Sequence, residues 1–312
     1  MQRSCKKLGI ELLEGEYDFE NWMNAVRGLE KEKEKGKRCE VCFDKRFDVS
    51  AHKALELGEK TFTTTLLVSP LKSQEQLKKS GELFEQRHGL KFIAVDYRAN
   101  GGTQDQSRVT KEEQLYRQDY CGCLFGLSMQ REGQHRLMDE MFSPISNQVL
   151  PASIEERLQL YKERMRLEDE NIEYKIVKHK FLNYREMNFK VIEGKNELID
   201  AFALTYSTLP RKKAQGRIEF SHNNIHYFNR EEIKFITLTH LNTLLSSEYK
   251  SMKEVIYNPP SLQAQKLLRD KIADEAYDLS PIIIVEKISD KKLTIFLDTL
   301  TYEDTKEKLI LI

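Results

Sequence analysis

The sequence lacks an excess of charge of either sign. Its 312 residues include 50 basic and 50 acidic side chains, so the formal net charge is zero. Nucleic-acid-binding proteins often carry a bulk positive charge that attracts phosphates over long distances. Bulk charge therefore gives no indication of nucleic-acid binding, and any basic surface must be local.

Long hydrophobic segments are also absent. No apolar run approaches the ~20 residues that a membrane-spanning helix requires. The first seven residues, Met1 to Lys7, are polar and lack the apolar centre of a signal peptide. We therefore expect a cytoplasmic protein with no membrane partner. With 39% hydrophobic and 32% charged residues, the chain is long enough for two globular domains.

Cysteine is scarce, with five residues at uneven spacing, which does not fit a secreted disulfide framework. Four of them form two close pairs, Cys39 with Cys42 and Cys121 with Cys123. Such pairs in a cytosolic protein are more often metal ligands or redox thiols. The fifth, Cys5, is expected on a short helix as a half-buried thiol.

The spacing of each pair limits its chemistry. In the first turns of a helix, Cys39 and Cys42 project from one face, where backbone N–H groups favour a thiolate. Cys121 and Cys123 flank one glycine, so the chain can bend until the thiols meet each other or a shared metal. Structural zinc sites prefer about two to four residues between neighbouring ligands. Iron–sulfur, zinc and dithiol chemistry all stay open.

Strand and helix patterns alternate in the first part of the chain. We expect helices over residues 2–8, 18–28, 39–57, 73–88 and 104–117, strands over 10–13, 61–68 and 91–95, and a solvated charged loop over 30–38. Such alternation favours an α/β fold with a parallel sheet. Ligands bind beyond the carboxyl ends of parallel strands, where Thr63–Ser69 and Gly101-Gly102 fall.

The pattern changes after the second cysteine pair. A proline-containing linker over 141–152 is followed by a charged helix over 153–171 and by strand patterns over 173–178, 217–220 and 226–228. A helix is expected over 261–277, and strands over 282–285 and 293–297. We therefore predict a first domain over 1–140 and a smaller α+β domain over 153–312.

Several polar side chains next to the cysteine pairs are candidate substrate contacts: Asp44, Arg46, Tyr116, Arg117 and Gln118. The group around Tyr116 can stack on and hydrogen-bond a nucleobase. The alternatives are a local ion pair between Asp44 and Arg46, and ordinary helix-end residues for the others. His52, on the same expected helix as Cys39, is interpreted as a satisfied helix residue rather than a ligand.

Five blocks of the sequence together resemble the QueH-type epoxyqueuosine reductases over roughly residues 1–125. The blocks are Glu20-Asn21-Trp22; Gly36-Lys37-Arg38-Cys39 with Cys42-Phe43-Asp44 and Arg46; Phe62-Thr63-Thr64-Thr65-Leu66 with Ser69-Pro70; Gly101-Gly102; and Tyr116-Arg117-Gln118 with Tyr120-Cys121-Gly122-Cys123. The resemblance implies a nucleotide-hydrolase-like (HUP/PP-loop-like) parallel-sheet domain. It also implies an iron–sulfur oxidoreductase that reduces epoxyqueuosine to queuosine at the wobble position of tRNA.

This resemblance implies roles for the four thiols. Cys39 and Cys42 would ligate a [4Fe–4S] cluster, and Cys121 and Cys123 would form a catalytic redox pair or hold a second iron that draws on the departing oxygen. Removing the epoxide oxygen consumes two electrons; a cluster passes one at a time, whereas a dithiol yields two. The implied partners are tRNA carrying epoxyqueuosine and an electron donor of open identity.

The sequence departs from the family pattern at one point. Family members begin with a strand that bears two adjacent cysteines, and this sequence contains no such pair. We therefore expect an N-terminally truncated chain that lacks its first strand and two of four cluster thiolates, binds a cluster poorly, and is inactive or unstable. Residues 150–312 lie outside the resemblance as a C-terminal extension. Its candidate tRNA contacts, with a solvated turn as the alternative, are Arg211, Lys212, Lys213, His222, His226 and Tyr227.

Two other functions compete with this hypothesis. The first is a zinc-stabilised nucleic-acid-binding module in which all four paired cysteines are structural. The second is a tRNA-thiolating enzyme of the same fold, which calls for a Ser-Gly-Gly-x-Asp-Ser-type loop that this chain does not contain. A brown colour after anaerobic purification distinguishes a cluster protein from a colourless zinc protein.

Overall fold

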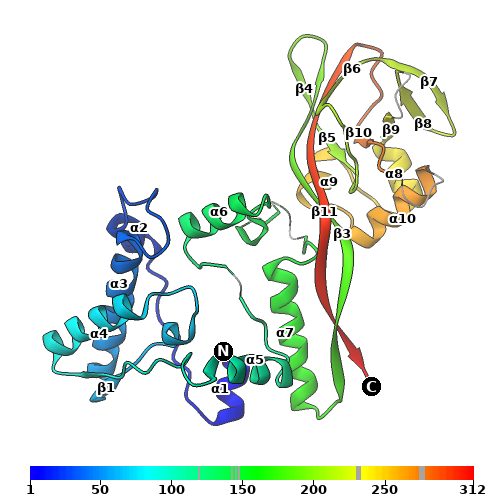
Figure 1. The fold of residues 1–312 in the computed structure, drawn as a ribbon. Coiled ribbons are helices and arrows are strands. Elements are labelled where there is room, and N and C mark those ends of the chain that lie inside the picture. The colour runs from blue at the N-terminus through cyan, green and yellow to red at the C-terminus, as the bar shows by residue number, and fades with distance from the viewer. Residues whose placement is uncertain (119, 142, 145, 147, 230–232, 274–277) are drawn as a thin grey trace. The chain divides into compact units, whose positions relative to one another are not determined.

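The computed structural model describes residues 1–118, 120–141, 143–144, 146, 148–229, 233–273 and 278–312. The chain divides into two compact units, Met1–Met138 and Asp139–Ile312, coloured blue to green and green to red in Figure 1. Among the described residues, none of the helices combines the length and the hydrophobicity that a transmembrane span requires.

The first unit is mainly helical. Its elements are α1 (Gln2–Leu8), α2 (Phe19–Ala25), α3 (Lys37–Glu56), β1 (Thr61–Phe62), the 3-10 turn η1 (Thr65–Val68), α4 (Gln74–His88), β2 (Lys91–Phe92), α5 (Gly102–Glu112) and α6 (Leu124–Gly133). β1 and β2 pair in parallel, in register from Thr61 opposite Lys91. The predicted α/β character with parallel pairing is confirmed, and the nucleotide-hydrolase-like assignment stays a prediction.

Several expected elements differ from the structure. The strand expected over 91–95 ends at Phe92, and the helix expected over 18–28 ends at Ala25. The strand expected over 61–68 ends at Phe62, because the Thr64 hydroxyl accepts a hydrogen bond from the Leu66 N–H and starts η1. The strand expected over 10–13 is wrong, since those residues are exposed and pair with no strand among the described residues. The helix expected over 104–117 ends at Glu112, where Gln114 turns the chain with a left-handed φ of 48°.

A single hydrophobic cluster joins α3, α4 and the two short strands. Its buried residues are Phe43, Phe47, Ala51, Ala54, Phe62, Leu67, Leu77, Phe84, Leu90 and Phe92. Those on α3 recur at helical spacing, so one face of the helix is buried. On α4, a Cβ at Gly81 would lie 2.0 Å from the Phe92 ring, so glycine is needed where the helix meets β2. This packing fixes α3, which carries the first cysteine pair.

The second unit contains two larger sheets. Its elements are η2 (Asp139–Met141), α7 (Ile154–Asp169), β3 (Tyr174–Glu193), β4 (Glu197–Ile199), β5 (Ala201–Ala203), β6 (Lys213–Gly216), β7 (Ile218–His222), β8 (Ile225–Phe228), β9 (Ile233–Thr237), α8 (Leu238–Leu245), α9 (Met252–Tyr257), α10 (Leu262–Ala273), β10 (Ile282–Val285) and β11 (Leu293–Leu311). Part of the expected linker (142, 145 and 147) and residues 274–277 of the expected helix lie outside the described residues.

One sheet has the strand order β4-β3-β11-β6 and the other β5-β10-β9-β8-β7. β3 and β11 form the long antiparallel ribbon visible in Figure 1, with a register shift at Asp298 and Thr299. β10 pairs in parallel with β9 and antiparallel with β5. The predicted α+β character of this unit is thus confirmed. One of its sheets is antiparallel, and the other is mixed.

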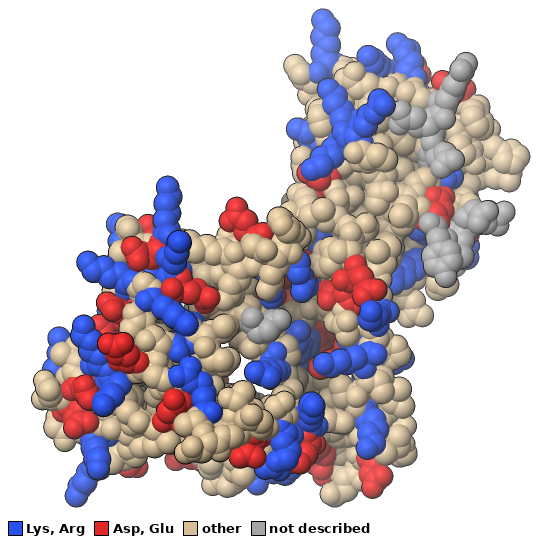
Figure 2. Space-filling model, viewed as in Figure 1, with Lys and Arg blue, Asp and Glu red and all other residues tan. Residues whose placement is uncertain are grey.

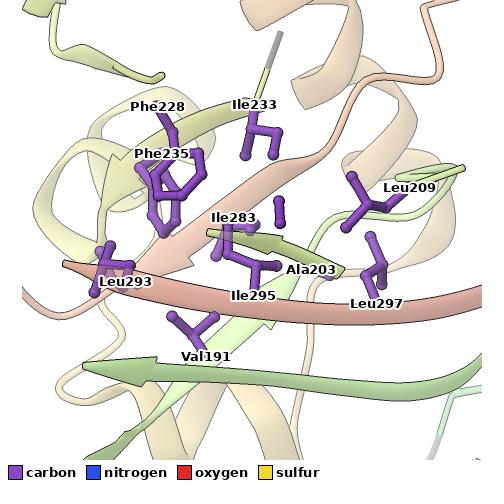
Figure 3. Packing of buried hydrophobic residues seen from close by; sticks show 12 residues of the cluster. Val191, Ala203, Leu209, Phe228, Ile233, Phe235, Ile283, Leu293, Ile295 and Leu297 are labelled. Carbon is purple, nitrogen blue, oxygen red and sulfur yellow. The ribbon is translucent and has the colours of Figure 1, made fainter. Parts of the chain in front are cut away.

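The five-stranded sheet has a hydrophobic core on each face. Ile283 and Val285 belong to the cluster shared with β3 and β11, drawn in Figure 3. Ile282 and Ile284 point to the opposite face and pack with residues of α8, α9 and α10. Alternate side chains of a strand point to opposite faces. Burial on both faces explains why residues 282–285 are continuously apolar.

Candidate functional site: two thiol pairs at helix starts

The first cysteine pair lies at the beginning of α3. Cys39 is in the first turn and Cys42 follows three residues later, so the two side chains share one face. The Cys39 sulfur accepts a hydrogen bond from the Lys35 N–H at 3.3 Å. Cys39 is half-buried and packs against the hydrophobic cluster of the first unit. The helix-start position predicted from the sequence is confirmed.

The second pair lies at the beginning of α6. Cys123 is the residue that caps this helix, and Cys121 precedes it by two positions. The Lys72 ammonium lies 3.5 Å from the Cys121 sulfur, and the Cys121 N–H donates to Gln130 Oε1 at 2.9 Å. A Cβ at Gly126 would lie 3.3 Å from that sulfur, so glycine leaves it room. All five cysteines are free thiols.

The two neighbouring thiols of the second pair differ in protonation. A hydrogen bond from the Cys123 thiol, aided by the Cys123 N–H and by Lys72, lowers the pKa of Cys121 to about 5. The same hydrogen bond, together with burial, raises the pKa of Cys123. At neutral pH the pair therefore consists of a Cys121 thiolate beside a Cys123 thiol, which combines a nucleophile or metal ligand with a proton donor.

Polar contacts connect the surroundings of the two pairs. Gln130 Nε2 donates to Glu34 Oε1 at 2.9 Å, and Lys72 Nζ lies 3.9 Å from the same oxygen. Glu34, Lys72, Cys121 and Gln130 thus form a closed ring of contacts. The next residue after Glu34 is Lys35, whose N–H reaches Cys39. The segment Glu34-Lys35 therefore contacts Cys39 of the first pair directly and Cys121 of the second pair through Lys72 and Gln130.

Arg38 joins the starts of α3 and α6. Its side chain is 2% exposed, donates to the backbone carbonyls of Leu29 and Glu30, and lies over the Phe125 ring at 5.7 Å. Phe125 in turn stacks on Trp22. The positive charge of Arg38 also acts on Cys123, in opposition to the rise in its pKa. The expectation that residues 30–38 form only a solvated loop is therefore wrong at Glu34 and Arg38.

Four residues of this site were not selected from the sequence: Glu34, Arg38, Lys72 and Gln130. The sequence could have identified Arg38, because it directly precedes Cys39 in a family block. No sequence pattern pointed to Lys72 or Gln130, since their partners are brought close only by folding. Tertiary contacts between distant charged or amide side chains leave no periodic pattern in a sequence.

The candidate substrate residues fall in different surroundings. The Asp44 carboxylate accepts a hydrogen bond from Ser80 on α4, while Arg46 is exposed on α3. Tyr116 is half-buried, and Arg117 is exposed in the segment after α5. Gln118 donates to the backbone carbonyl of Tyr120 at 2.7 Å. Their role as substrate contacts stays a prediction.

The donor chemistry suits a soft metal, but the structure does not gather the sulfurs around one point. The four half-buried free thiols lie near two helix starts, and no three of their sulfur atoms, all of them in described residues, lie within 4.8 Å of one another. Thiolates are the ligands that iron–sulfur clusters and zinc use most. Arg38 and Lys72 place positive charge beside the sulfurs, which offsets the negative charge of several thiolates.

Comparison with known proteins assigns the family. The family model described as "Epoxyqueuosine reductase QueH" matches residues 1–129. The epoxyqueuosine reductase QueH of Helicobacter pylori is 35% identical over 322 aligned residues, which cover 97% of this chain and 85% of that protein. The chain belongs to the QueH family of epoxyqueuosine reductases.

The similarity to other QueH proteins is confined to a shorter part of the chain. The Streptococcus pyogenes QueH is 37% identical over 121 residues, covering 39% of this chain and 48% of the relative. The Thermotoga maritima QueH is 38% identical over 121 residues, covering 38% of this chain and 63% of the relative. The alignment with the Helicobacter pylori QueH, by its 97% coverage, extends into the second unit, which lay outside the resemblance seen in the sequence.

Proposed function

We propose that this QueH protein reduces epoxyqueuosine in tRNA to queuosine, and that the reaction takes place at the two cysteine pairs of the first unit. The observation that carries the proposal is the second cysteine pair at the start of α6, with the Lys72 ammonium 3.5 Å from the Cys121 sulfur. The hydrogen bond between the two thiols lowers the pKa of Cys121 and raises that of Cys123. This pair offers two electrons and a proton at one point, and epoxide deoxygenation needs both.

The overall step balances with these thiols as the reductant. Both C–O bonds of the epoxide break, and a C=C bond forms between the two carbons. The oxygen takes up two protons and leaves as water. One proton comes from the Cys123 thiol, and the other comes from solvent because Cys121 is already deprotonated. Cys121 and Cys123 lose two electrons and become a disulfide. A one-electron donor must then reduce the disulfide in two steps.

Cys39 and Cys42 are the residues that would hold the iron–sulfur cluster in this proposal. A [4Fe–4S] cluster bound there would supply electrons one at a time. The two cysteines provide half of the about four thiolates that such a cluster takes, so we expect weak loading in this chain. Whether Cys121 and Cys123 hold a second iron instead of forming a disulfide is tested by iron counts in their variants.

The ring around Glu34 would keep the second pair in its reactive form. Lys72 holds a positive charge against Cys121, and Glu34 keeps Lys72 and Gln130 in position. Gln130 fixes the backbone of Cys121. These contacts orient Cys121 through its backbone N–H and place one positive charge at its sulfur.

The proposal is tested on tRNA that carries epoxyqueuosine. The anaerobically reconstituted chain is incubated with this tRNA and a chemical one-electron reductant, and the nucleosides are separated by mass. Turnover by the wild type would overturn the expectation that this chain is inactive. Under the proposal, we expect the wild type and the control Cys5→Ser to form queuosine at the low rate that weak cluster loading allows. Cys39→Ser, Cys42→Ser, Cys121→Ser and Cys123→Ser should each lower conversion at least ~100-fold, an effect on the order expected for loss of a catalytic group. Equal conversion by Cys121→Ser, or a zinc-loaded colourless protein without turnover, contradicts the proposal.

The second unit supplies a candidate tRNA-contacting surface in this proposal. Figure 2 shows lysine and arginine side chains at the end of this unit that carries β4 and β6. Arg211, Lys212 and Lys213 are exposed in the segment that leads into β6, although Lys212 also pairs with Asp298 at 2.8 Å. Tyr227 stacks on the exposed Phe220 ring, and His226 bonds to Ser221. Exposed aromatic rings and basic side chains are the groups that single-stranded RNA-binding surfaces use.

This surface is tested by tRNA binding at several salt concentrations. Replacing Arg211, Lys212 and Lys213 with Gln should weaken binding and reduce its dependence on salt, since each lost phosphate contact releases fewer counterions. Lys253→Gln, an exposed change on α9, is the matched control. An unchanged salt dependence in the triple variant excludes these residues as phosphate contacts.

A further inference from the structure

Two histidines and an aspartate meet between α3 and α4, at a position separate from the cysteine pairs. Asp48 and His52 are one turn apart on α3, and His88 is the last residue of α4. One ligand atom from each lies within 4.8 Å of the other two. Asp48 Oδ1 is 3.4 Å from His52 Nδ1 and 4.0 Å from His88 Nε2. Within the part of the chain that the structure describes, no other group of His, Cys, Asp or Glu is this close.

His88 presents a ring nitrogen that lacks a hydrogen-bond partner. Its Nε2 atom is buried, and no described residue hydrogen-bonds to it. The ring is held in place by stacking on Phe84 and by edge contact with His52 at 4.8 Å between centroids. Buried polar atoms of folded proteins almost always have a partner. A cation bound between the three side chains provides one.

The donor atoms and their spacing suit a transition-metal ion. Zinc takes imidazole nitrogens and carboxylate oxygens at ~2.0–2.1 Å in a tetrahedral arrangement, which separates neighbouring donors by ~3.4 Å. The distances of 3.4 and 4.0 Å to Asp48 are therefore near those of a bound ion. His52 Nδ1 hydrogen-bonds to the Asp48 backbone carbonyl at 2.8 Å, and the side chain is 58% exposed. Binding of an ion by Nδ1 exchanges this hydrogen bond for a bond to the metal. Two imidazoles and one carboxylate leave a fourth position for water.

We propose that Asp48, His52 and His88 form a second metal site, which takes Zn²⁺ or a similar divalent transition ion. The site joins the C-terminal half of α3 to the end of α4, the two helices that build the core of the first unit. Cys39 precedes Asp48 by nine residues on the same helix, about 14 Å along its axis. The ion and the sulfur centre are thus independent sites. The hydrogen bond between His52 Nδ1 and the Asp48 carbonyl agrees with the interpretation of His52 as a satisfied helix residue, and the proposal adds a ligand role in the metal-bound form.

The site is tested by metal content and spectroscopy on the full chain. Zinc binding is measured by equilibrium dialysis for the wild type, for His52→Ala, for His88→Gln, and for the control His179→Ala on β3. We expect each triad variant to bind one equivalent less, or at least ~10-fold more weakly, and the control to bind as the wild type does. His52 is exposed, so its variant tests the site even where His88→Gln disturbs the fold.

Cobalt distinguishes this site from the thiols. The equivalent of Co²⁺ that is lost in His52→Ala should lack the intense sulfur-to-metal charge-transfer absorption of thiolate ligands. Equal zinc binding by the wild type and both triad variants overturns the site. A lost equivalent that does show sulfur charge transfer also overturns it, because the ion would then be bound by cysteine.

Discussion

The two units of the chain are built in contrasting ways. The first has one hydrophobic cluster and a sheet of two-residue strands, and it contains all five cysteines. The second has a five-stranded sheet with a hydrophobic core on each face and no cysteine. In the first unit, polar contacts around Glu34, Lys72 and Arg38 hold the helix starts. The reactive thiols therefore lie in the unit with the smaller hydrophobic core. Functional segments are generally drawn from the less stable parts of a protein.

The largest expected loss of stability comes from removing one buried aromatic ring from the hydrophobic core of each unit. Phe47→Ala in the first unit and Phe228→Ala in the second each remove a ring that is at most 1% exposed, which should cost about 3–5 kcal/mol of stability. Phe47→Ala should also make Cys39 and Cys42 react quickly with thiol reagents, whereas Phe228→Ala should not. Denaturant unfolding and thiol labelling measure both. The control is Phe220→Ala, whose ring is 55% exposed.

A difference in thiol reactivity with pH is expected within the first unit. Because the pKa of Cys121 is lowered to about 5, its thiolate is present above that pH and is lost as the pH falls through it. In the metal-free reduced protein, Cys121 should therefore alkylate at a nearly constant rate from about pH 6 upward. Unfolded protein should show a rate that rises up to the ordinary thiol pKa near ~8.5. A folded protein with that later rise would contradict the thiolate assignment.

The contacts that lower the pKa of Cys121 contribute unequally. Two variants measure their contributions separately. The hydrogen bond from Cys123 is the largest cause and the Lys72 charge a smaller one. Both Cys123→Ala and Lys72→Met should raise the pH at which Cys121 alkylates, Cys123→Ala by more. Lys79→Met, an exposed change on α4, is the matched control. If Lys72→Met behaves as the control does, the ammonium is not acting on the thiol.

The smallest expected effects are those of matched helix caps in the two units. Ser73 accepts a hydrogen bond from the Gln76 N–H at the start of α4, and Thr237 does so from the His240 N–H at the start of α8. Ser73→Ala and Thr237→Ala should each cost about 1 kcal/mol. Hydrogen exchange should show the loss only in the unit that carries the change. A shared loss of protection would mean that the units unfold together.

Local features of the fold could be predicted from the sequence. The limits of α3 and α4 follow from apolar spacing and from Gly58 and Gly89, which have the left-handed φ angles of 72° and 66° at the helix ends. The apolar run from Ile282 to Val285 predicted a buried strand. These signals depend on neighbouring residues, so a sequence contains them directly.

Long-range features could not be predicted in the same way. Residues 194–292 separate β3 from β11 in the chain, and the register of the pair depends on both strands at once. In the site, the sequence pointed to the four cysteines, and the family blocks included Arg38. Lys72, Glu34 and Gln130 come from charged or polar segments that are distant in the sequence and meet only in the folded chain.

The most direct measurement is the iron and sulfide content, with the electron paramagnetic resonance spectrum, of the chain reconstituted anaerobically beside its cysteine variants. We predict that the wild type and Cys5→Ser take up iron and sulfide, although weakly, and that Cys39→Ser and Cys42→Ser lose both. Cys121→Ser should keep the iron if Cys121 and Cys123 form a disulfide, and should lose part of it if they hold a second iron. Zinc in place of iron, or iron and sulfide retained by Cys39→Ser and Cys42→Ser, would contradict the account.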